Sequence, residues 1–431
     1  MICYTVLMIS LPLLKNKIGA KSKPTSNQDN SAQNNYLSVD IGTEYLKVLR
    51  FGITDEGVEI RDVSVVHQQQ HAMDKGVILS LETVIENIRL AIHEVSSGTE
   101  DLPIDGMVLG LAGEYIQGVS IVVNYDRAKK ASKEVSEKEE VSVIKKIQEQ
   151  IMNSGKEDLS ARTGLSVEDI EILHVTLTGI SIGGIHVDNL VGHTGQDVQL
   201  TFYASFAPKT YVKALQKLSK ELGIDIVGVV SQPFAVARAF KRSREKDFSA
   251  IFIDIGGGTT DVAVVQAGSV LDTQMFAFGG RVFTKEIARR MNIDYRHAEL
   301  RKLKFSEGKV AKSIYRQVYE IVSDVTAIWL NLLQSALEEV EDVEVLPDEI
   351  YLCGGGSSLP NIRKSMLAFP WKELLPFANI PKVKHFEVSD LLNVTDKSGK
   401  LNAVYHITPA ALAVYAYDKM NSPTVYNDMK K

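Results

Sequence analysis

Short apolar runs that end in polar turns alternate with helical stretches along most of the chain. Runs within residues 36–51, 58–69 and 106–112 predict strands, and the apolar spacing across 81–96 predicts a helix. From residue 250 a second series begins, in which closely spaced strand patterns precede helical ones. This alternation, with groups of neighbouring strands, predicts an α/β fold with mixed sheets.

The second series contains the longest helical pattern. Strands are predicted at 250–255, 261–266 and 269–277, and a long helix is predicted at 310–340. Apolar residues recur at helical spacing along this long helix, and Trp329 is one of them. Such a stripe is typical of a face that packs against a core.

The region between the two series, residues 113–208, has a different pattern. Lys and Glu alternate over 126–150, which predicts a solvated loop followed by an amphipathic helix. Strand-like runs follow at 172–177, 179–187 and 196–207, divided by Gly and Asn. We therefore expect a small α+β insert.

Composition limits the class of protein. A chain of 431 residues is too long for one compact core, so two or more domains are expected. Its 45% hydrophobic and 24% charged residues are ordinary for a globular protein. A net charge of −6 argues against general nucleic-acid binding. The only cysteines, Cys3 and Cys353, make a disulfide framework improbable.

The first residues differ from the rest. Residues 1–14 are nearly all apolar, lysines follow up to Lys23, and residues 24–35 resemble a polar linker. One interpretation is a membrane tether, whose lysines would lie at an anionic surface. The other is a disordered tail or a start codon assigned too early, and the sequence leaves both open.

The candidate chemistry begins with a repeated motif. Apolar strands end at Asp40 and again at Asp254, and each is followed by a Gly-containing turn with Thr residues. Glycine lets a backbone approach a ligand closely, exposed N–H groups bind anionic oxygen, and a strand-end Asp can hold a hydrated metal ion. The repeat predicts two related halves that hold one nucleotide between them.

A third Gly-rich turn follows the predicted strand at 349–352. It reads Cys-Gly-Gly-Gly-Ser over residues 353–357 and precedes a helical pattern. Alone it would indicate a tight strand-to-helix turn, but with the other two it indicates a loop on the adenosine side. No GxxxxGK[ST] pattern is present, so a P-loop is not expected.

These motifs carry a resemblance to a known superfamily. The two turns, the QPFAVA segment that starts at Gln232 and the GGGSS loop resemble actin, sugar kinases and heat-shock ATPases. The segment ILHVTLTGISIGGIHVDNLVGHTGQDVQL, from residue 172, resembles FtsA, the bacterial cell-division ATPase family. The segments DIGGGTTD, GGRVFTKEIA and AELRKLKF follow in FtsA order.

The resemblance implies a fold, a ligand and site residues. The fold would be actin-like, with two related lobes of five-stranded type around a nucleotide cleft and an inserted subdomain. The ligand would be ATP with Mg²⁺ held through water by Asp40 and Asp254, and Gln232 would position the attacking water. The other residues expected to contact the nucleotide are Gly42, Thr43, Lys47, Gly256, Gly257, Gly258, Thr259, Thr260, Gly280, Glu286, Glu299, Lys302, Gly354, Gly355, Gly356 and Ser357.

The resemblance also implies boundaries between parts of the chain. The expected parts are 1–35 (apolar segment and linker), 36–112 and 209–247 (first lobe), 113–208 (insert), 248–404 (second lobe) and 405–431 (a helix returning to the first lobe, and a tail). The outer part of the second lobe, about 281–340, is shorter than FtsA requires. The sequence therefore leaves open whether subunits make filament contacts there.

The resemblance is compatible with three functions. The first is an FtsA-like scaffold at the cytoplasmic face of the membrane, with at most slow ATPase activity. Its partners would be the tubulin-like division protein and other divisome proteins, and self-association is a further possibility. Its attachment to the inner membrane surface would use residues 1–23. The second is a PilM-like adaptor of type IV pilus assembly, and the third is a metabolic kinase of the same superfamily.

Overall fold

The computed structural model describes residues 34–96, 102–113, 116–187, 189–245, 247–340 and 343–421. The apolar N-terminal segment lies outside the described residues, so the membrane tether stays a prediction. In the described part of the chain, no helix has both the length and the apolar character that crossing a membrane requires.

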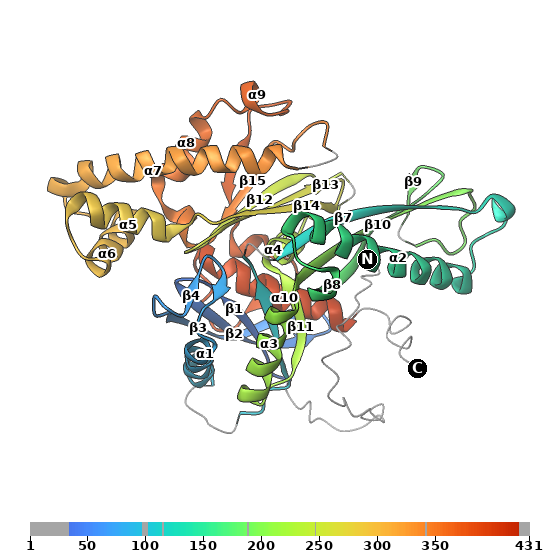
Figure 1. Ribbon diagram of the computed structural model, residues 1–431, viewed down its shortest axis with the longest axis horizontal. Helices are drawn as coiled ribbons and strands as arrows, with labels where there is room; N and C mark the ends of the chain where they lie inside the picture. Colours follow the sequence, from blue (N-terminus) through green and yellow to red (C-terminus); the bar gives the residue numbers. More distant parts are fainter. Residues whose placement is uncertain are drawn as a thin grey trace.

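The first lobe is built on a mixed sheet (Figure 1). Its strand β1 (Tyr36–Ile41) is antiparallel to β2 (Tyr45–Thr54), and β2 is antiparallel to β3 (Gly57–His67). On the other side of β1, β6 (Gly106–Leu111) and β11 (Ile226–Ser231) run parallel to it. The sheet therefore has its first strand in the middle.

The second lobe repeats this pattern. Strand β12 (Ala250–Ile255) is antiparallel to β13 (Thr260–Gln266), which is antiparallel to β14 (Ser269–Phe276). Strands β15 (Glu349–Cys353) and β16 (Lys382–His385) lie on the other side and run parallel to β12. The prediction of two related lobes with mixed sheets is confirmed.

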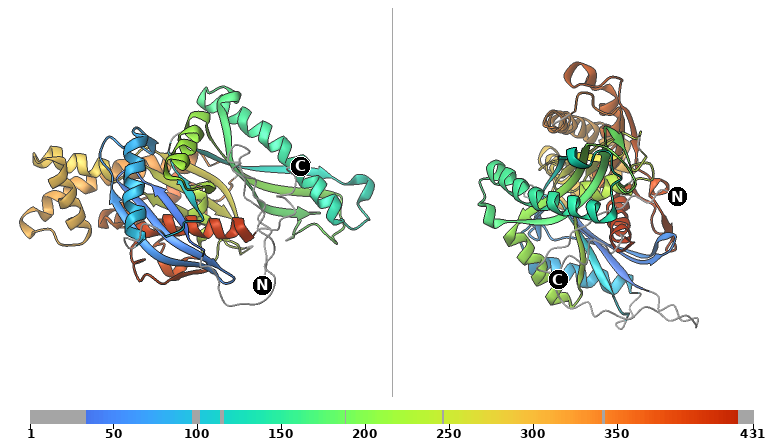
Figure 2. Two further views of the ribbon diagram at one scale, coloured as in Figure 1. Left: turned by 90° about the horizontal axis from the view of Figure 1, so that it is seen from below. Right: turned by 90° about the vertical axis from the view of Figure 1, so that its right-hand side faces the viewer.

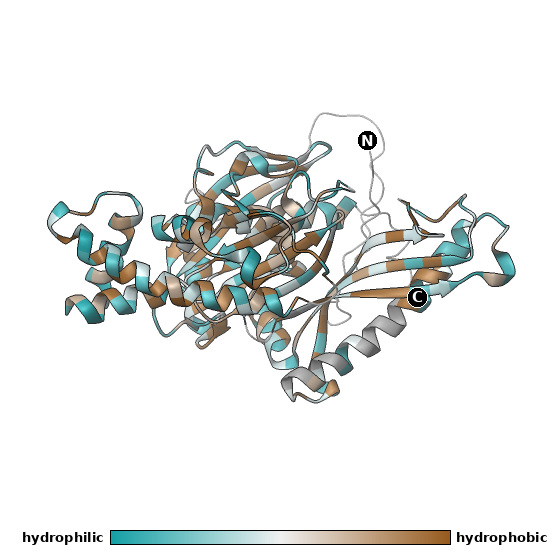
Figure 3. Cartoon of the chain, turned by 90° about the horizontal axis from the view of Figure 1, so that it is seen from above, coloured by the Kyte–Doolittle hydropathy of each residue, from teal (hydrophilic) through white to brown (hydrophobic). Residues whose placement is uncertain are grey.

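Helices cover each face of the first sheet. On its outer face, α1 (Leu81–Val95) and α3 (Lys209–Leu222) pack on one apolar cluster. On its inner face, α4 (Gln232–Ala239) and α10 (Ile407–Asn421) lie between the sheets of the two lobes and share a second cluster. Colouring by hydropathy shows largely hydrophobic strands at the centre of the molecule, whereas the long helices carry both kinds of residue (Figure 3).

Short elements complete the lobes. They are β4 (Met73–Asp74), β5 (Val77–Ile78), β17 (Val394–Asp396), α9 (Trp371–Leu374) and the 3-10 turns at 128–130, 167–169, 355–358, 388–390 and 404–406. Strand β17 pairs with β3, so a late segment of the chain completes the first sheet.

The outer face of the second sheet carries α5 (Gly280–Met291), α7 (Lys312–Glu338) and α8 (Pro360–Ala368), with α6 (Tyr295–Ser306) beside them. Residues 280–338, all of which are described, contain no strand. The Trp-containing stripe of α7 is core, as predicted, because Trp329 is fully buried.

The insert between the lobes consists of β7 (Gln117–Asp126), α2 (Glu137–Thr163), β8 (Ile170–Ile182), β9 (Ile185–His186) and β10 (Asp197–Pro208). These elements enclose a core of their own. The expected break at Gly179 was wrong, because β8 passes through it. Pairing with β10 shifts register beside Gly179, so the glycine marks a bulge and not the end of a strand.

The insert also joins the second lobe, which the sequence did not indicate. Edge strand β14 pairs with β7 through Asp272 and Thr273, opposite Val119 and Gly118, and a continuous sheet results (Figure 2). Gly118 permits this approach, since a Cβ atom there would lie 1.8 Å from the hydroxyl of Tyr203. The boundaries drawn from the sequence stay a prediction.

Substitution of Trp329 tests the core of the second lobe. Its indole donates a hydrogen bond of 2.9 Å to Thr260 Oγ1 in the turn-bearing hairpin. Trp329→Ala should lower the free energy of unfolding in urea by about 3–5 kcal/mol, and Trp329→Phe by a smaller amount. The neighbouring Ile328, which is 55% exposed, supplies the control, and Ile328→Ala should change stability little. Equal losses at the two positions would contradict this assignment.

Candidate functional site

The first candidate turn links β1 to β2. Asp40 near the end of β1 is buried, and the register of the hairpin places it opposite Lys47. Lys47 Nζ donates to Asp40 Oδ2 at 2.6 Å, and the amide of Gln232 donates to Asp40 Oδ1 at 2.7 Å. The structure therefore brings these predicted residues together around one carboxylate.

Burial and charge act on Lys47 in opposite directions. Burial alone lowers its pKa, but the adjacent Asp40 carboxylate and the nearby Asp254 raise it, and the net shift of the pKa is upward. Lys47 therefore stays protonated and supplies positive charge between the strand-end carboxylates.

The second turn links β12 to β13 and carries its own acidic pair. Asp254 and Asp261 lie opposite each other in the hairpin register, and both are buried. Thr408 at the start of α10 donates to Asp254 Oδ2, and Thr259 donates to Asp261 Oδ2 at 3.1 Å. Burial raises the pKa of both carboxyls, and the charge of Asp254 raises that of Asp261 further.

The two turns are in direct contact. A Cβ atom at Gly258 would lie 2.5 Å from Thr43 Oγ1, and one at Gly257 would lie 2.7 Å from Glu44 Cβ. Real Cβ atoms do not come this close to other atoms, so only glycine fits at these positions. The two halves of the chain thus meet at the turns that the sequence singled out.

The third Gly-rich loop lies behind the second turn. Gly354 has a positive φ of 77°, and a Cβ atom there would lie 2.0 Å from Asp254 Oδ1. The side chain of Ser357 is buried and donates to the Gly354 carbonyl at 2.7 Å. Gly355 has no atom near its missing side chain and faces open space.

A further set of predicted residues forms a buried cluster on α5 and α6. Lys302 Nζ donates to the Gly280 carbonyl at 3.0 Å and pairs with Glu299 at 2.8 Å. Thr284, which sequence reasoning missed, connects Lys302 to Glu299 through its hydroxyl. Glu286 is not part of this cluster, because its contacts are with Arg289 on the surface.

Two further residues of the site were missed because their partners are distant in sequence. Arg281 follows the Gly-Gly pair and forms a buried ion pair with Glu44 of the first lobe. Its position gave one signal, since a cation in the first turn of a helix opposes the helix dipole and needs another reason to be there. Thr408 gave no comparable signal.

A cavity of about 610 Å³ opens beside this cluster, between the first lobe and α6. Its volume is in the range of small-molecule sites. It is lined by Tyr45, His67, Gln70, Asp294, Tyr295, Arg296, Glu299, Leu300 and Leu303.

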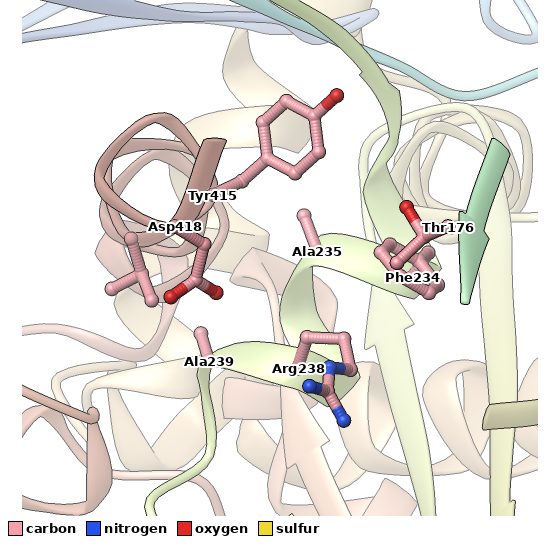
Figure 4. Close-up of a pocket in the computed structure, with 8 residues that line it drawn as sticks. Thr176, Phe234, Ala235, Arg238, Ala239, Tyr415 and Asp418 are labelled. Atoms are coloured by element: carbon pink, nitrogen blue, oxygen red, sulfur yellow. The ribbon is translucent and has the colours of Figure 1, made fainter. Parts of the chain in front are cut away.

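A second pocket lies away from the turns, among α4, α10 and β8 (Figure 4). The side chains of Phe234, Arg238, Tyr415 and Asp418 are among those around it. Its volume of about 10 Å³ is at the lower limit for one water molecule, so it cannot hold a nucleotide.

Comparison with known proteins agrees with the geometry. The family model described as "Cell division protein FtsA" matches residues 251–373. The FtsA of Enterococcus hirae is 24% identical over 88% of this chain and 86% of its own length. The FtsA of Bacillus subtilis is 22% identical over 76% and 74% of the two chains.

A solved structure, "PilM-PilN type IV pilus biogenesis complex", has a TM-score of 0.63 at 15% identity and covers 89% of this chain and 98% of its own. At this identity it bears on the fold alone. The fold is that of the actin-like ATPases, as predicted. The resemblance to FtsA that the sequence motifs indicated is confirmed.

The pKa of Asp261 gives a pH-dependent prediction. A raised pKa contributes stability that is complete below the ordinary value of 3.8 and is lost as pH rises through the raised value. Asp261→Asn cannot ionise, so its free energy of unfolding relative to that of the unmodified protein should rise as pH increases above 3.8. Urea unfolding at several pH values, without nucleotide or metal, measures this difference.

Asp55→Asn is the matched control, since Asp55 is exposed on a β-turn. A constant difference for Asp261→Asn over the same range would contradict the assignment.

Proposed function

We propose that this chain binds ATP with Mg²⁺ between its two lobes and acts as an FtsA-like cell-division protein, a nucleotide-switched scaffold at the membrane. The observation that carries the proposal is the convergence of the two glycine turns with Asp40, Lys47 and Asp254. Glycines that no larger residue could replace, next to buried acidic strand ends, are what a phosphate and metal site needs.

The residues present fit the absent ligand. Asp40, Asp254 and Glu44 bring more negative charge into the site than Lys47 and Arg281 balance. A buried excess of carboxylates favours a divalent cation. Bound Mg²⁺ would supply charge neutralisation for the phosphates, with Asp40 and Asp254 holding it through water.

The remaining contacts follow from the same geometry. Gly42, Thr43 and the turn at 256–259 would hold the phosphates, with Lys47 between the strands. Glu299 lines the 610 Å³ cavity, and Lys302 connects Glu299 to the Gly280 carbonyl. These three residues would contact the ribose and base, together with the loop at 354–357. Thr260, another predicted contact, accepts a hydrogen bond from Trp329, which fixes the β12–β13 hairpin against α7. Glu286, the remaining predicted contact, pairs with Arg289 on the surface and lies outside this cluster.

Gln232 supports a switch more than a fast enzyme. Its amide donates to Asp40 Oδ1 and to the Gly110 carbonyl, so it is held by the first lobe. A residue that positions water helps only when its amide is directed at that water. Hydrolysis would therefore be slow, and lobe closure around ATP would control partner binding or self-association.

The proposed partners come from the FtsA relatives. They are the tubulin-like division protein and other divisome proteins, with the chain at the cytoplasmic face of the membrane and residues 1–23 as the attachment. A PilM-like role in pilus assembly is the alternative, supported by the fold similarity alone. A metabolic kinase has no comparable support.

Replacement of Asp40 tests the nucleotide site. Asp40→Asn removes a charge that would hold hydrated Mg²⁺, so affinity for ATP with Mg²⁺ should fall about 10- to 100-fold in calorimetric titrations. Chelation of Mg²⁺ should weaken binding to the unmodified protein similarly. Asp324→Asn, on the exposed surface of α7, should bind normally. ATP binding that ignores both Mg²⁺ and Asp40 would refute this site.

Partner binding separates division from pilus assembly. The full chain, immobilised with ATP and Mg²⁺, should retain the tubulin-like division protein of the same organism. Pilus assembly proteins from that organism, offered at equal concentration, should pass through. The opposite pattern would replace the division proposal with the PilM-like one.

A further inference from the structure

Arg281 connects the second lobe to the first at the glycine turns. It lies in the first turn of α5, and its backbone N–H donates to the Gly257 carbonyl at 2.8 Å. Its guanidinium reaches across to the first lobe. There it donates to Glu44 Oε2 at 2.6 Å, to the Thr43 carbonyl at 2.7 Å and to the Met73 carbonyl at 2.8 Å.

Glu44 is enclosed in the same way. Its carboxylate accepts from Arg281 and from the hydroxyl of Tyr295 at 3.3 Å, both in the second lobe. His67 of its own lobe lies 3.2 Å from its other oxygen. The side chain of Glu44 is 6% exposed and that of Arg281 is 10% exposed. The pair is therefore buried between the lobes.

The charges of Glu44 and Arg281 depend on each other. Glu44 directly follows Thr43 in a turn that would hold phosphate, where a carboxylate alone would repel the ligand. Arg281 opposes the dipole at the start of α5. Each charge is unfavourable where it lies unless the other is present, and separating the lobes would leave both without that partner.

The pair also lies at the edge of the large cavity. Tyr295 and His67, which both contact Glu44, line that cavity together with Tyr45 and Glu299. Tyr45 and His67 belong to the first lobe, and Tyr295 and Glu299 to the second. A nucleotide that enters through the cavity would pass between groups that the pair holds together.

We infer that the Glu44–Arg281 ion pair is an interlobe clasp that holds the two turns in contact and limits the rate of nucleotide exchange. This inference rests on the proposed nucleotide site, but the closing of the lobes by the pair can be measured without any nucleotide. The residues act by positioning the turns, and no step of hydrolysis is assigned to them.

The test uses the full chain with Glu44→Gln, Arg281→Gln and both changes together. Release of a fluorescent ADP analogue, chased with unlabelled ATP in a stopped-flow instrument, should be at least about tenfold faster in each variant. Arg281→Lys keeps the charge but not the forked geometry, so its release rate should be intermediate. Arg290→Gln, which breaks the exposed pair with Asp324, should release at the unmodified rate.

A second measurement follows the lobes without nucleotide. Spin labels at Glu86→Cys on α1 and Lys304→Cys on α6, in a Cys3→Ser background, report the distance between exposed positions of the two lobes. Loss of the pair should shift this distribution to longer distances. Labels at Glu86→Cys and Lys217→Cys, both in the first lobe, should show no shift.

The outcomes separate the two proposals. If the unmodified protein binds no nucleotide while the variants lengthen the interlobe distance, the proposed function fails and the clasp stands. If the unmodified protein binds nucleotide while release rates and distances are unchanged in the variants, the clasp is refuted. Glu44→Gln has nearly the same size as the native residue, so a folding failure of Arg281→Gln leaves the test decisive.

Discussion

The contact between the two glycine turns is the constraint on which the rest of the site depends. Gly257 and Gly258 leave no room for side chains, because Thr43 and Glu44 occupy the space where Cβ atoms would be. The strands that lead into the turns fix the positions of Asp40 and Asp254. Helices α4 and α10, which lie between the sheets, fix the spacing of the lobes. A larger residue at Gly257 or Gly258 would move the lobes apart. The carboxylates of the first lobe would then move away from those of the second.

Electrostatics explains why so much acidic charge is tolerated there. Lys47 lies between the strand ends, Arg281 neutralises Glu44, and the raised pKa of Asp261 favours its neutral form. Burial of unpaired carboxylates is otherwise costly. The arrangement therefore favours the binding of a cation. Without one, the stability of the site depends on Lys47 and Arg281.

Local patterns explain which features could be predicted. A strand that ends in Asp and Gly, and the apolar stripe around Trp329, are patterns within short segments of the chain. The two lobes and their turns could therefore be predicted from the sequence. The pairing of Lys47 with Asp40 was not predicted, because the sequence indicated Lys47 only as a phosphate contact. Thr408, Arg281 and the β14–β7 junction depend on residues that meet only when distant segments fold together. Gly179 misled for another reason, since a bulge and a strand end have the same local signal.

The β14–β7 junction ties the insert to the chemistry of the turns. The insert follows the first lobe in the chain, yet its strand β7 hydrogen-bonds to the second lobe at Asp272 and Thr273. Ser269 and Ser120 add hydrogen bonds across the same boundary, to Thr178 and Val270. Any rotation of one lobe against the other must therefore strain or bend this junction. Because the Glu44–Arg281 pair would resist the same rotation, the insert and the turns constrain one motion. A change at the site that moves the lobes would therefore also move the insert.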